Sequence, residues 1–243
     1  MDVRTLIISD IHANLTALEA VLKDAGEFDQ AWCLGDIVGY GPDPNECIER
    51  IRGLKNLTCI MGNHDAALLG FISMEAFNPE ARDALLVQAQ MLSPESMEFL
   101  ELVSVRTMVD GITLAHGSPR NPIWEYIMNA SMARENFSEF ETQVCLVGHT
   151  HIPCIFIEQP RKAARLLMPE SGDMWRSPER FILNPGSVGQ PRDRNSKASY
   201  VIYESEEQIW QFKRVKYNIA EVQQRVLERG LPSRHGSRLH FGI

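Results

Sequence analysis

The 243-residue sequence lacks the features that mark nucleic-acid-binding and membrane proteins. It has 24 Lys and Arg against 32 Asp and Glu, a net charge of -8, and no basic run that would follow nucleic acid or anionic lipid. The first apolar run begins after four residues and is broken by Asp10, so it is too short for a signal peptide or a membrane span. We therefore expect a cytoplasmic protein with no nucleic-acid partner and no membrane partner.

Cysteine usage is also sparse. The five cysteines form an odd set without a C-x-x-C pair, and four of them lie in apolar runs. The pattern predicts reduced core residues rather than a disulfide framework. The cysteines are Cys33, Cys47, Cys59, Cys145 and Cys154.

The chain shows no internal repeat and no low-complexity linker, and 44% of its residues are hydrophobic. Length and composition predict one domain over residues 1–243. Short runs rich in Ile, Val and Leu alternate early with helical patterns, which indicates parallel strands of an α/β sheet. From Val105 onward the pattern favours antiparallel strands, with a hairpin turn at Asp110-Gly111.

Capping residues predict where the helices lie. Asn14 is a candidate N-cap for the first helix, and Asn78 and Ser93 each precede a proline at a first helical position within a helix-rich insertion. The last helix precedes a polar tail, in which we expect His235 and His240 to be solvated. The predicted ranges are 14–24, 44–52, an insertion at about 66–104, and 218–229.

Six apolar runs each end in a short cluster of ligand-type or glycine-rich residues: "LIISDIH", "CLGDIVGYG", "CIMGNHD", "TLAHGSP", "CLVGHTH" and "ILNPGSVGQPRD". Ligands of α/β sheets bind beyond the carboxyl ends of the strands. If these runs are neighbouring strands, their polar side chains converge on one edge. The side chains are Asp10, His12, Asp36, Asn63, His64, His116, His149 and His151.

A single histidine at a strand end is usually only a hydrogen-bonded polar residue, so "GHTH" alone does not establish a metal site. The combination favours bound cations, because no Lys or Arg accompanies these carboxylates to neutralise them. Two carboxylates, an amide oxygen and four imidazoles suit Mn²⁺, Fe or Zn²⁺. Seven ligands exceed what one catalytic zinc takes, so two ions about 3.5 to 4 Å apart are expected, bridged by one carboxylate.

The ordered motifs D-x-H, G-D, G-N-H-D, H-G and G-H-T-H resemble the signature of calcineurin-like metallophosphoesterases, over residues 8 to about 193. The resemblance implies an α/β fold of four layers, an α/β/β/α sandwich, with a dinuclear site in the loops at one end. It also implies two divalent transition-metal ions, with manganese favoured. One ion would be held by Asp10, His12, Asp36 and His151, and the other by Asp36, Asn63, His116 and His149.

The same resemblance implies that His64 is not a ligand but hydrogen-bonds the phosphate or protonates the leaving group, with Asp65 orienting it. The expected activity is metal-dependent hydrolysis of a phosphate ester. Two ions lower the pKa of a bridging water, and the resulting hydroxide attacks the phosphorus in line with the leaving oxygen. This chemistry needs no nucleophilic Ser or Cys.

"GDIVGYGPDPNE" and "NPGSVGQPRD" resemble a branch of bacterial and archaeal predicted phosphoesterases. Phosphoprotein phosphatases supply an arginine where this chain has Gly39 and Tyr40, so we expect a small-molecule phosphodiester or a nucleotide-like substrate. Arg192 could offer a cation to that substrate or belong to an ordinary turn. Trp124 and Tyr126 could stack on it, although half-buried packing is the preferred interpretation.

Three other functions stay open at this point. A non-catalytic metal-binding scaffold on the same fold would not need the complete ligand set found here. A phosphomonoesterase or a protein phosphatase would need another source of the missing arginine. A nuclease is weakened by the acidic balance.

Overall fold

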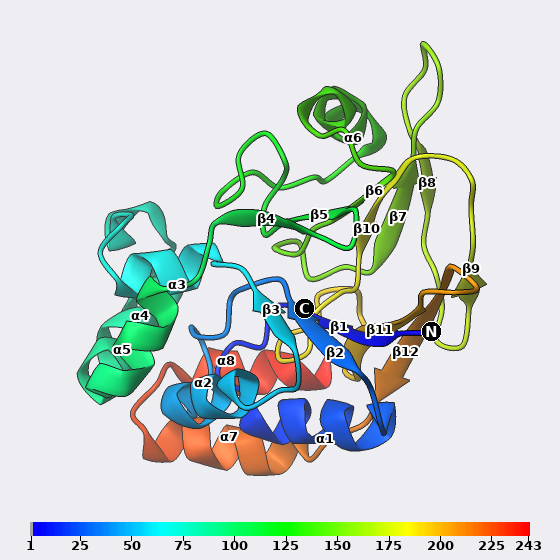
Figure 1. The fold of residues 1–243 in the computed structure, drawn as a ribbon. Coiled ribbons are helices and arrows are strands. Elements are labelled where there is room, and N and C mark those ends of the chain that lie inside the picture. Colours follow the sequence, from blue (N-terminus) through cyan, green and yellow to red (C-terminus); the bar gives the residue numbers. More distant parts are fainter. Residues whose placement is uncertain (1) are drawn as a thin grey trace.

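The computed structural model describes residues 2–243, and in it two six-stranded mixed sheets pack face to face between helices (Figure 1). The first sheet has the order β3-β2-β1-β11-β12-β9. Strands β1, β2 and β3 are parallel, whereas β11 and β12 run antiparallel to their neighbours. The bounds are β1 (Arg4–Ile8), β2 (Gln30–Cys33), β3 (Leu57–Cys59), β9 (Met174–Trp175), β11 (Ala198–Glu204) and β12 (Ile209–Val215).

The second sheet has the order β4-β5-β6-β10-β7-β8. Its three middle strands β5, β6 and β10 are parallel, and the remaining pairs are antiparallel. Each sheet therefore contains one parallel triplet. The bounds are β4 (Arg106–Val109), β5 (Ile112–Ala115), β6 (Val144–Leu146), β7 (Cys154–Ile157), β8 (Arg165–Leu167) and β10 (Phe181–Asn184).

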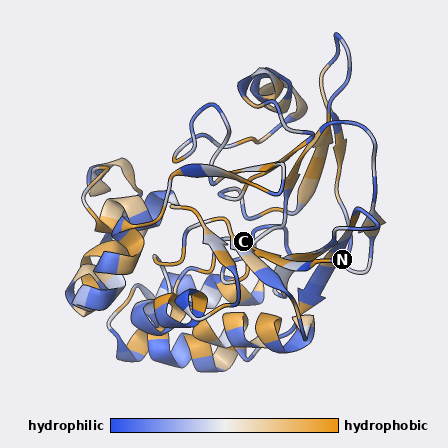
Figure 2. Ribbon diagram, in the orientation of Figure 1, coloured by the Kyte–Doolittle hydropathy of each residue, from blue (hydrophilic) through white to orange (hydrophobic). Residues whose placement is uncertain are grey.

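Alternating side chains of β1 show how the layers are made. Leu6 and Ile8 pack into a core with the helices on the outer face of the first sheet, whereas Ile7 packs into the core between the two sheets. Both faces of the strand are thus apolar, as expected for a strand buried on two sides. Figure 2 shows hydrophobic residues in the strands and along helix faces, with hydrophilic residues on the outside.

The outer layers complete an α/β/β/α sandwich, as expected. Helices α1 (Leu15–Ala25), α2 (Pro44–Arg52) and α7 (Ile219–Glu228) lie below the first sheet in Figure 1. Helix α6 (Ala130–Asn136) covers the second sheet, where Ala133 packs with Phe156 and Ile182. Each of the three interfaces between the four layers therefore holds its own hydrophobic core.

The predicted helix starts are confirmed by their caps. The side-chain oxygens of Asn14, Asn78 and Ser93 each accept a hydrogen bond from a backbone N–H in the first turn of α1, α4 (Pro79–Met91) and α5 (Pro94–Glu101). The hairpin turn at Asp110-Gly111 is confirmed as well, with positive φ at both residues. The range predicted as an insertion begins inside α3 (Asn63–Leu68) and contains η1 (Met74–Ala76), α4 and α5.

The expectation of a polar tail is wrong. After α7 the chain forms α8 (Ser233–Ser237) and η3 (Arg238–His240), and Leu231 and Leu239 pack against Ala84 of α4. His235 is only 3% exposed, and its Nε2 lies 3.0 Å from the main-chain oxygen of Glu80. The end of the chain is therefore anchored on the insertion by two leucines eight residues apart. Of the two histidines expected to be solvated, only His240 is exposed.

All five cysteines are free, and Cys59 alone is not fully buried, which confirms the prediction of reduced core residues. Short helix η2 (Phe137–Glu139) follows α6. None of the helices within residues 2–243 has the length and apolar character needed to cross a membrane.

Candidate active site

The predicted site residues follow the carboxyl ends of the two parallel triplets. The ends of β1, β2 and β3 carry Asp10, Asp36 and Asn63, and the ends of β5 and β6 carry His116 and His149. The side chains converge as expected, and both sheets contribute to the site, because the loops that follow the two parallel triplets lie at the same end of the sandwich.

One group of side chains surrounds Asp10 and Asp36. The ligand atoms of Asp10, His12, Asp36 and His151 all lie within 4.8 Å of one another, and all four residues are buried. The His151 Nε2 lies 3.4 Å from Asp10 Oδ1, and the His12 Nε2 lies 3.6 Å from Asp36 Oδ2. A cation placed among these atoms would be within reach of two carboxylates and two imidazoles.

A second group shares Asp36. The ligand atoms of Asp36, His116 and His149 also lie within 4.8 Å of one another. The His116 Nε2 lies 3.3 Å from Asp36 Oδ2 and 3.2 Å from the side-chain oxygen of Asn63. The two buried groups, joined through one carboxylate, are consistent with a dinuclear metal site.

Backbone carbonyls orient three of the imidazoles. The Nδ1 atoms of His12, His116 and His151 lie 2.9, 2.8 and 2.6 Å from the main-chain oxygens of Val38, Leu34 and Gln190. A carbonyl can only accept, so Nδ1 carries the proton in each of these rings. In His12 and His151 this leaves the Nε2 lone pair facing the carboxylates. Histidines that bind metals are typically held through their second ring nitrogen in this way.

The charge states of three buried imidazoles also suit a metal. Burial lowers the pKa of His12, His149 and His151 well below its usual value, so these imidazoles are neutral, the form that coordinates ions. Burial opposes ionisation of Asp36, but the surrounding imidazoles, His116 first, hold the pKa of Asp36 well below its usual value. Burial likewise opposes the charged form of His116, yet Asp36 raises the pKa of His116 to about 10.

The donor set fits two cations on further grounds. Every ion pair that Asp10 and Asp36 form within residues 2–243 is with a histidine, so no Lys or Arg neutralises them directly. The Nε2 of His149 is buried and has no hydrogen-bond partner among the described residues. Unpaired buried polar atoms are costly, and bound cations would relieve that cost.

Backbone conformation at the site is unusual. Five of the predicted ligands have positive φ, between 48° and 66°: Asp10, His12, Asp36, His149 and His151. Residues other than glycine rarely adopt this region, and such residues cluster at functional sites. The loops are therefore bent to aim these side chains inward.

Asp65 holds the loop that carries Asp36. Its Oδ2 accepts hydrogen bonds from the N–H groups of Asp36 (2.8 Å) and Gly62 (2.9 Å), and its Oδ1 accepts from Ile37 (3.0 Å) and Val38 (3.2 Å). Burial and the charge of Asp36 raise the pKa of Asp65 to about 6, and the Gly62 and Val38 N–H groups oppose that rise. We had expected Asp65 to orient His64, but none of its hydrogen bonds in the described chain reaches the His64 ring.

Two glycines permit close packing at the site. A Cβ atom at Gly62 would overlap the carboxylate of Asp36, and a Cβ atom at Gly39, where φ is +90°, would overlap the ring of His64. The insertion braces the same loop, since Gln88 of α4 accepts from the Gly39 N–H and donates to the Gly41 carbonyl, each at 2.6 Å. Gln88 gave no signal in the sequence, because its partners lie almost 50 residues earlier.

His64 is buried beside the two ligand groups. Its ring centroid lies 4.9 Å from that of His12, 4.6 Å from Tyr40 and 4.8 Å from Phe77, and Asp36 Oδ1 accepts its backbone N–H at 2.9 Å. Burial lowers the pKa of His64 to about 4. Its position next to Asn63 is therefore fixed by packing on several sides.

Aromatic side chains line the site more closely than we expected. The Tyr126 ring stacks on His149 with centroids 3.6 Å apart, and 40% of Tyr126 is exposed. The ring centroid of Trp124 lies 6.3 Å from that of His149 and 5.1 Å from that of Phe77. Half-buried packing, the interpretation preferred from the sequence, is therefore not the whole description of Trp124 and Tyr126. Both rings also lie beside His149, a candidate metal ligand.

Residues 3–208 match the calcineurin-like phosphoesterase superfamily domain. The chain belongs to this superfamily. A crystal structure of a metallophosphoesterase from Sphaerobacter thermophilus is 47% identical and covers all of both chains, with a TM-score of 0.92. With its two ligand groups intact, the chain is a metallophosphoesterase.

Two further relatives place this metallophosphoesterase within the superfamily. An uncharacterized protein of Methanocaldococcus jannaschii is 37% identical over 243 residues, which is 97% of each chain. A symmetrical bis(5′-nucleosyl)-tetraphosphatase of Photobacterium profundum is 29% identical over 158 residues, which is 61% of this chain and 54% of that protein. The metallophosphoesterase thus spans about half of the tetraphosphatase.

Proposed function

We propose that this metallophosphoesterase hydrolyses a small-molecule phosphodiester or a nucleotide-like phosphate. The observation that carries the proposal is the wall beside His64, where Gly39 and Tyr40 stand and the Tyr40 ring packs 4.6 Å from the His64 ring. Resemblance to the protein phosphatases would place an arginine there. A diester carries one negative charge and has less need of a bidentate guanidinium than a dianionic monoester.

The proposed metal ligands are the residues of the two groups, with Asp36 shared between them. We propose Asn63 as a further ligand of the second group, since its side-chain oxygen lies 3.2 Å from His116 Nε2. Ions held there, with manganese our first choice, would supply Lewis-acid polarisation of the phosphoryl group. The chain itself supplies imidazoles, a shared carboxylate and backbone contacts that fix both.

His64 is the proposed catalytic side chain outside the ligand set. It is held against Tyr40 and Phe77, so its ring N–H can donate a hydrogen bond to the ester from a fixed position, and the charged form of the ring could transfer a proton. For Asp65 the contacts favour a positioning role, in which the carboxylate fixes the Asp36 loop.

Arg192 is the proposed cation for the substrate. Its Nη2 donates to the Tyr40 hydroxyl at 3.2 Å and to the side-chain oxygen of Gln190 at 2.9 Å, which holds the guanidinium beside the site. Its Nε is buried without a partner among the described residues. Arg192 therefore has donor capacity left for an anion.

The name of one relative supports the nucleotide-like part of the proposal. The protein of Photobacterium profundum is named as a bis(5′-nucleosyl)-tetraphosphatase, although the match covers only 61% of this chain and 54% of that protein. A match of that extent supports a chemical class and not a particular compound.

Matched aryl phosphomonoester and phosphodiester substrates test the proposal directly. With the same metal, we expect kcat/KM to favour the diester or to be similar for both. Replacing Arg192 with Ala provides the second arm. A strong monoester preference that disappears in Arg192→Ala would show that an arginine from another loop replaces the missing one, and the diester proposal would be wrong.

A further inference from the structure

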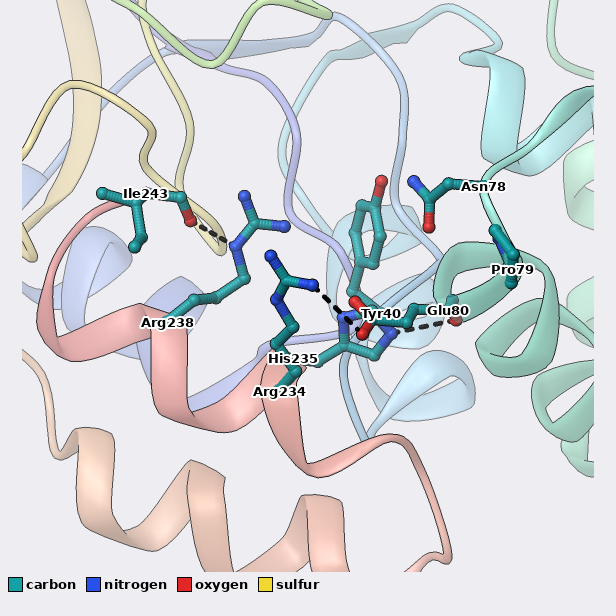
Figure 3. A pocket seen from close by; sticks show the side chains of 8 residues that line it. All are labelled: Tyr40, Asn78, Pro79, Glu80, Arg234, His235, Arg238 and Ile243. Carbon is teal, nitrogen blue, oxygen red and sulfur yellow. Dashed lines mark hydrogen bonds and ion pairs between the residues drawn. The ribbon is translucent and has the colours of Figure 1, made fainter.

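A second cavity lies next to the active site. Tyr40 lines this cavity and also packs against His12 of the site. The cavity has a volume of about 490 Å³ and is formed by three segments distant in sequence (Figure 3). Tyr40 comes from the loop after β2, residues 78–80 come from the start of α4, and the remaining wall comes from α8, η3 and Ile243. The folded C-terminal segment thus builds part of a cavity.

Tyr40 connects this cavity to the active site. Its ring centroid lies 4.7 Å from that of His12 and 4.9 Å from that of His235, which lines the cavity. Its hydroxyl accepts a hydrogen bond from Arg192. The ring of His12, a candidate metal ligand, and the ring of His235, in the cavity wall, therefore contact the same Tyr40 ring.

The side chains of the cavity wall include two arginines against one glutamate, in a protein that is acidic overall. Figure 3 shows the guanidinium groups of Arg234 and Arg238 beside Tyr40, with the Asn78 amide on its other side. Glu80 is the only acidic side chain in the described wall, and it pairs with Arg234 at 3.3 Å. One guanidinium, that of Arg238, is left without a carboxylate side chain.

Arg238 is the cation best placed to bind a ligand. Burial, together with the positive charges of Arg192 and Arg234, lowers the pKa of Arg238, so the three guanidinium groups act on one another. Within residues 2–243 its only hydrogen bond runs from Nε to the main-chain oxygen of Ile243, which leaves both Nη groups available. Half-buried, mutually repelling guanidinium groups are stabilised by an anion that accepts from their planar donors.

From these contacts we infer that the cavity binds a second phosphate group of the substrate, through Arg238 with support from Arg234. The inference rests on the proposed function, because the first phosphate is the one at the metal ligands. The substrate class is then a phosphate ester that carries a further phosphate on the same small molecule. A diester without a second phosphate would bind at the metal ligands alone and would not contact Arg238.

Two chromogenic esters test this subsite. The 4-nitrophenyl ester of thymidine 5′-phosphate is compared with the same ester bearing a 3′-phosphate, so that the same bond is cleaved in both. We expect the added phosphate to raise kcat/KM about tenfold or more, the effect of one charge-assisted hydrogen-bonded pair. In Arg238→Gln this ratio falls to about one, and in Arg234→Gln it falls less, because Arg234 is already paired and 73% exposed.

Arg229→Gln is the matched control, since Arg229 is an exposed arginine of the same C-terminal part whose ion pair is with Glu46 instead. It should keep the wild-type ratio. Hydrolysis of the plain ester reports on the proposed function, and the ratio of the two esters reports on the subsite. Turnover of both esters with a ratio near one in the wild type would overturn the subsite while leaving the phosphoesterase function in place.

Binding of inorganic pyrophosphate to the metal-free protein provides a readout other than activity. Calorimetry should show binding that Arg238→Gln weakens about tenfold or more and Arg229→Gln does not. Pyrophosphate binding that depends on Arg238, combined with an ester ratio near one, would mean that the cavity takes a free anion and that the substrate assignment is wrong. Absence of any Arg238-dependent binding would reject the anion site as well.

Discussion

The carboxylate of Asp65 should matter more for stability than its position outside the ligand set suggests. Each of its two oxygens accepts hydrogen bonds from two buried backbone N–H groups. Oδ2 accepts from Asp36 and Gly62, and Oδ1 accepts from Ile37 and Val38. In Asp65→Asn one oxygen becomes an NH₂ group, which cannot accept. Two buried N–H groups then face a donor instead of an acceptor.

Each buried donor left without a partner costs about 1–3 kcal/mol, so we expect Asp65→Asn to lower the free energy of unfolding by roughly 2–6 kcal/mol. That is a large part of the total of about 5–15 kcal/mol typical of folded proteins. Urea unfolding of the metal-free protein, followed by circular dichroism, measures the change. Asp83→Asn is the control for the same chemical substitution, because Asp83 is exposed on α4.

The same substitution should loosen metal binding. Val38 contributes the carbonyl that fixes Nδ1 of His12, and the Asp36 N–H is held directly by Asp65, so both ligand groups depend on this carboxylate. We expect Asp65→Asn to retain less metal than Asp83→Asn after equal dialysis. A loss of stability below about 1 kcal/mol, with metal content unchanged, would refute the positioning role.

Three other predictions follow from the site and its surroundings. Asp36→Asn should weaken the binding of two ions, whereas His151→Ala should mainly remove one. Elemental analysis of the metal-reconstituted proteins measures both effects, and a wild type that holds a single ion would contradict the dinuclear site. His64→Ala should keep its metals and lose about 10²- to 10⁴-fold in turnover, while loss of metal in proportion to activity would make His64 a ligand. Hydrogen bonds from Arg120 lower the pKa of Glu125 to about 2, so its contribution to stability is complete above about pH 4.5 and is lost as the pH falls toward about 2. The difference in unfolding free energy between wild type and Glu125→Gln should therefore shrink across that window, and a constant difference would contradict the assignment.

Local signals predicted the elements that position the site. The N-caps at Asn14, Asn78 and Ser93 act within one helical turn, and the Asp110-Gly111 turn acts within one hairpin, so each is readable without the rest of the chain. Strand ends were readable for the same reason. An apolar run that stops at a cluster of polar residues marks the end of a buried strand wherever the strand is packed.

Long-range packing was not readable. His235 follows a polar stretch, and nothing near it in sequence indicates that Leu239 and Leu231 pack its helix against α4. Its burial depends on contacts with residues about 155 positions earlier, such as Glu80. The assignment of the strands to two sheets depended on tertiary contacts in the same way. A pattern along one strand does not tell which other strands its face will meet.

The positive φ angles at five candidate ligands explain why the site needs so many supporting contacts. A residue other than glycine in this conformation costs on the order of 1–3 kcal/mol, although Asp and His tolerate it better than most residues. Five such residues would together cost an amount comparable to the whole stability of a domain. Backbone hydrogen bonds between the loops after β1 and β2, from the N–H of His12 to the Asp36 carbonyl and from the N–H of Asp10 to the Gly35 carbonyl, offset part of this cost, each at 3.0 Å. The carboxylate of Asp65 offsets another part, so the protein fold, and not an ion alone, sets the directions in which the ligands point.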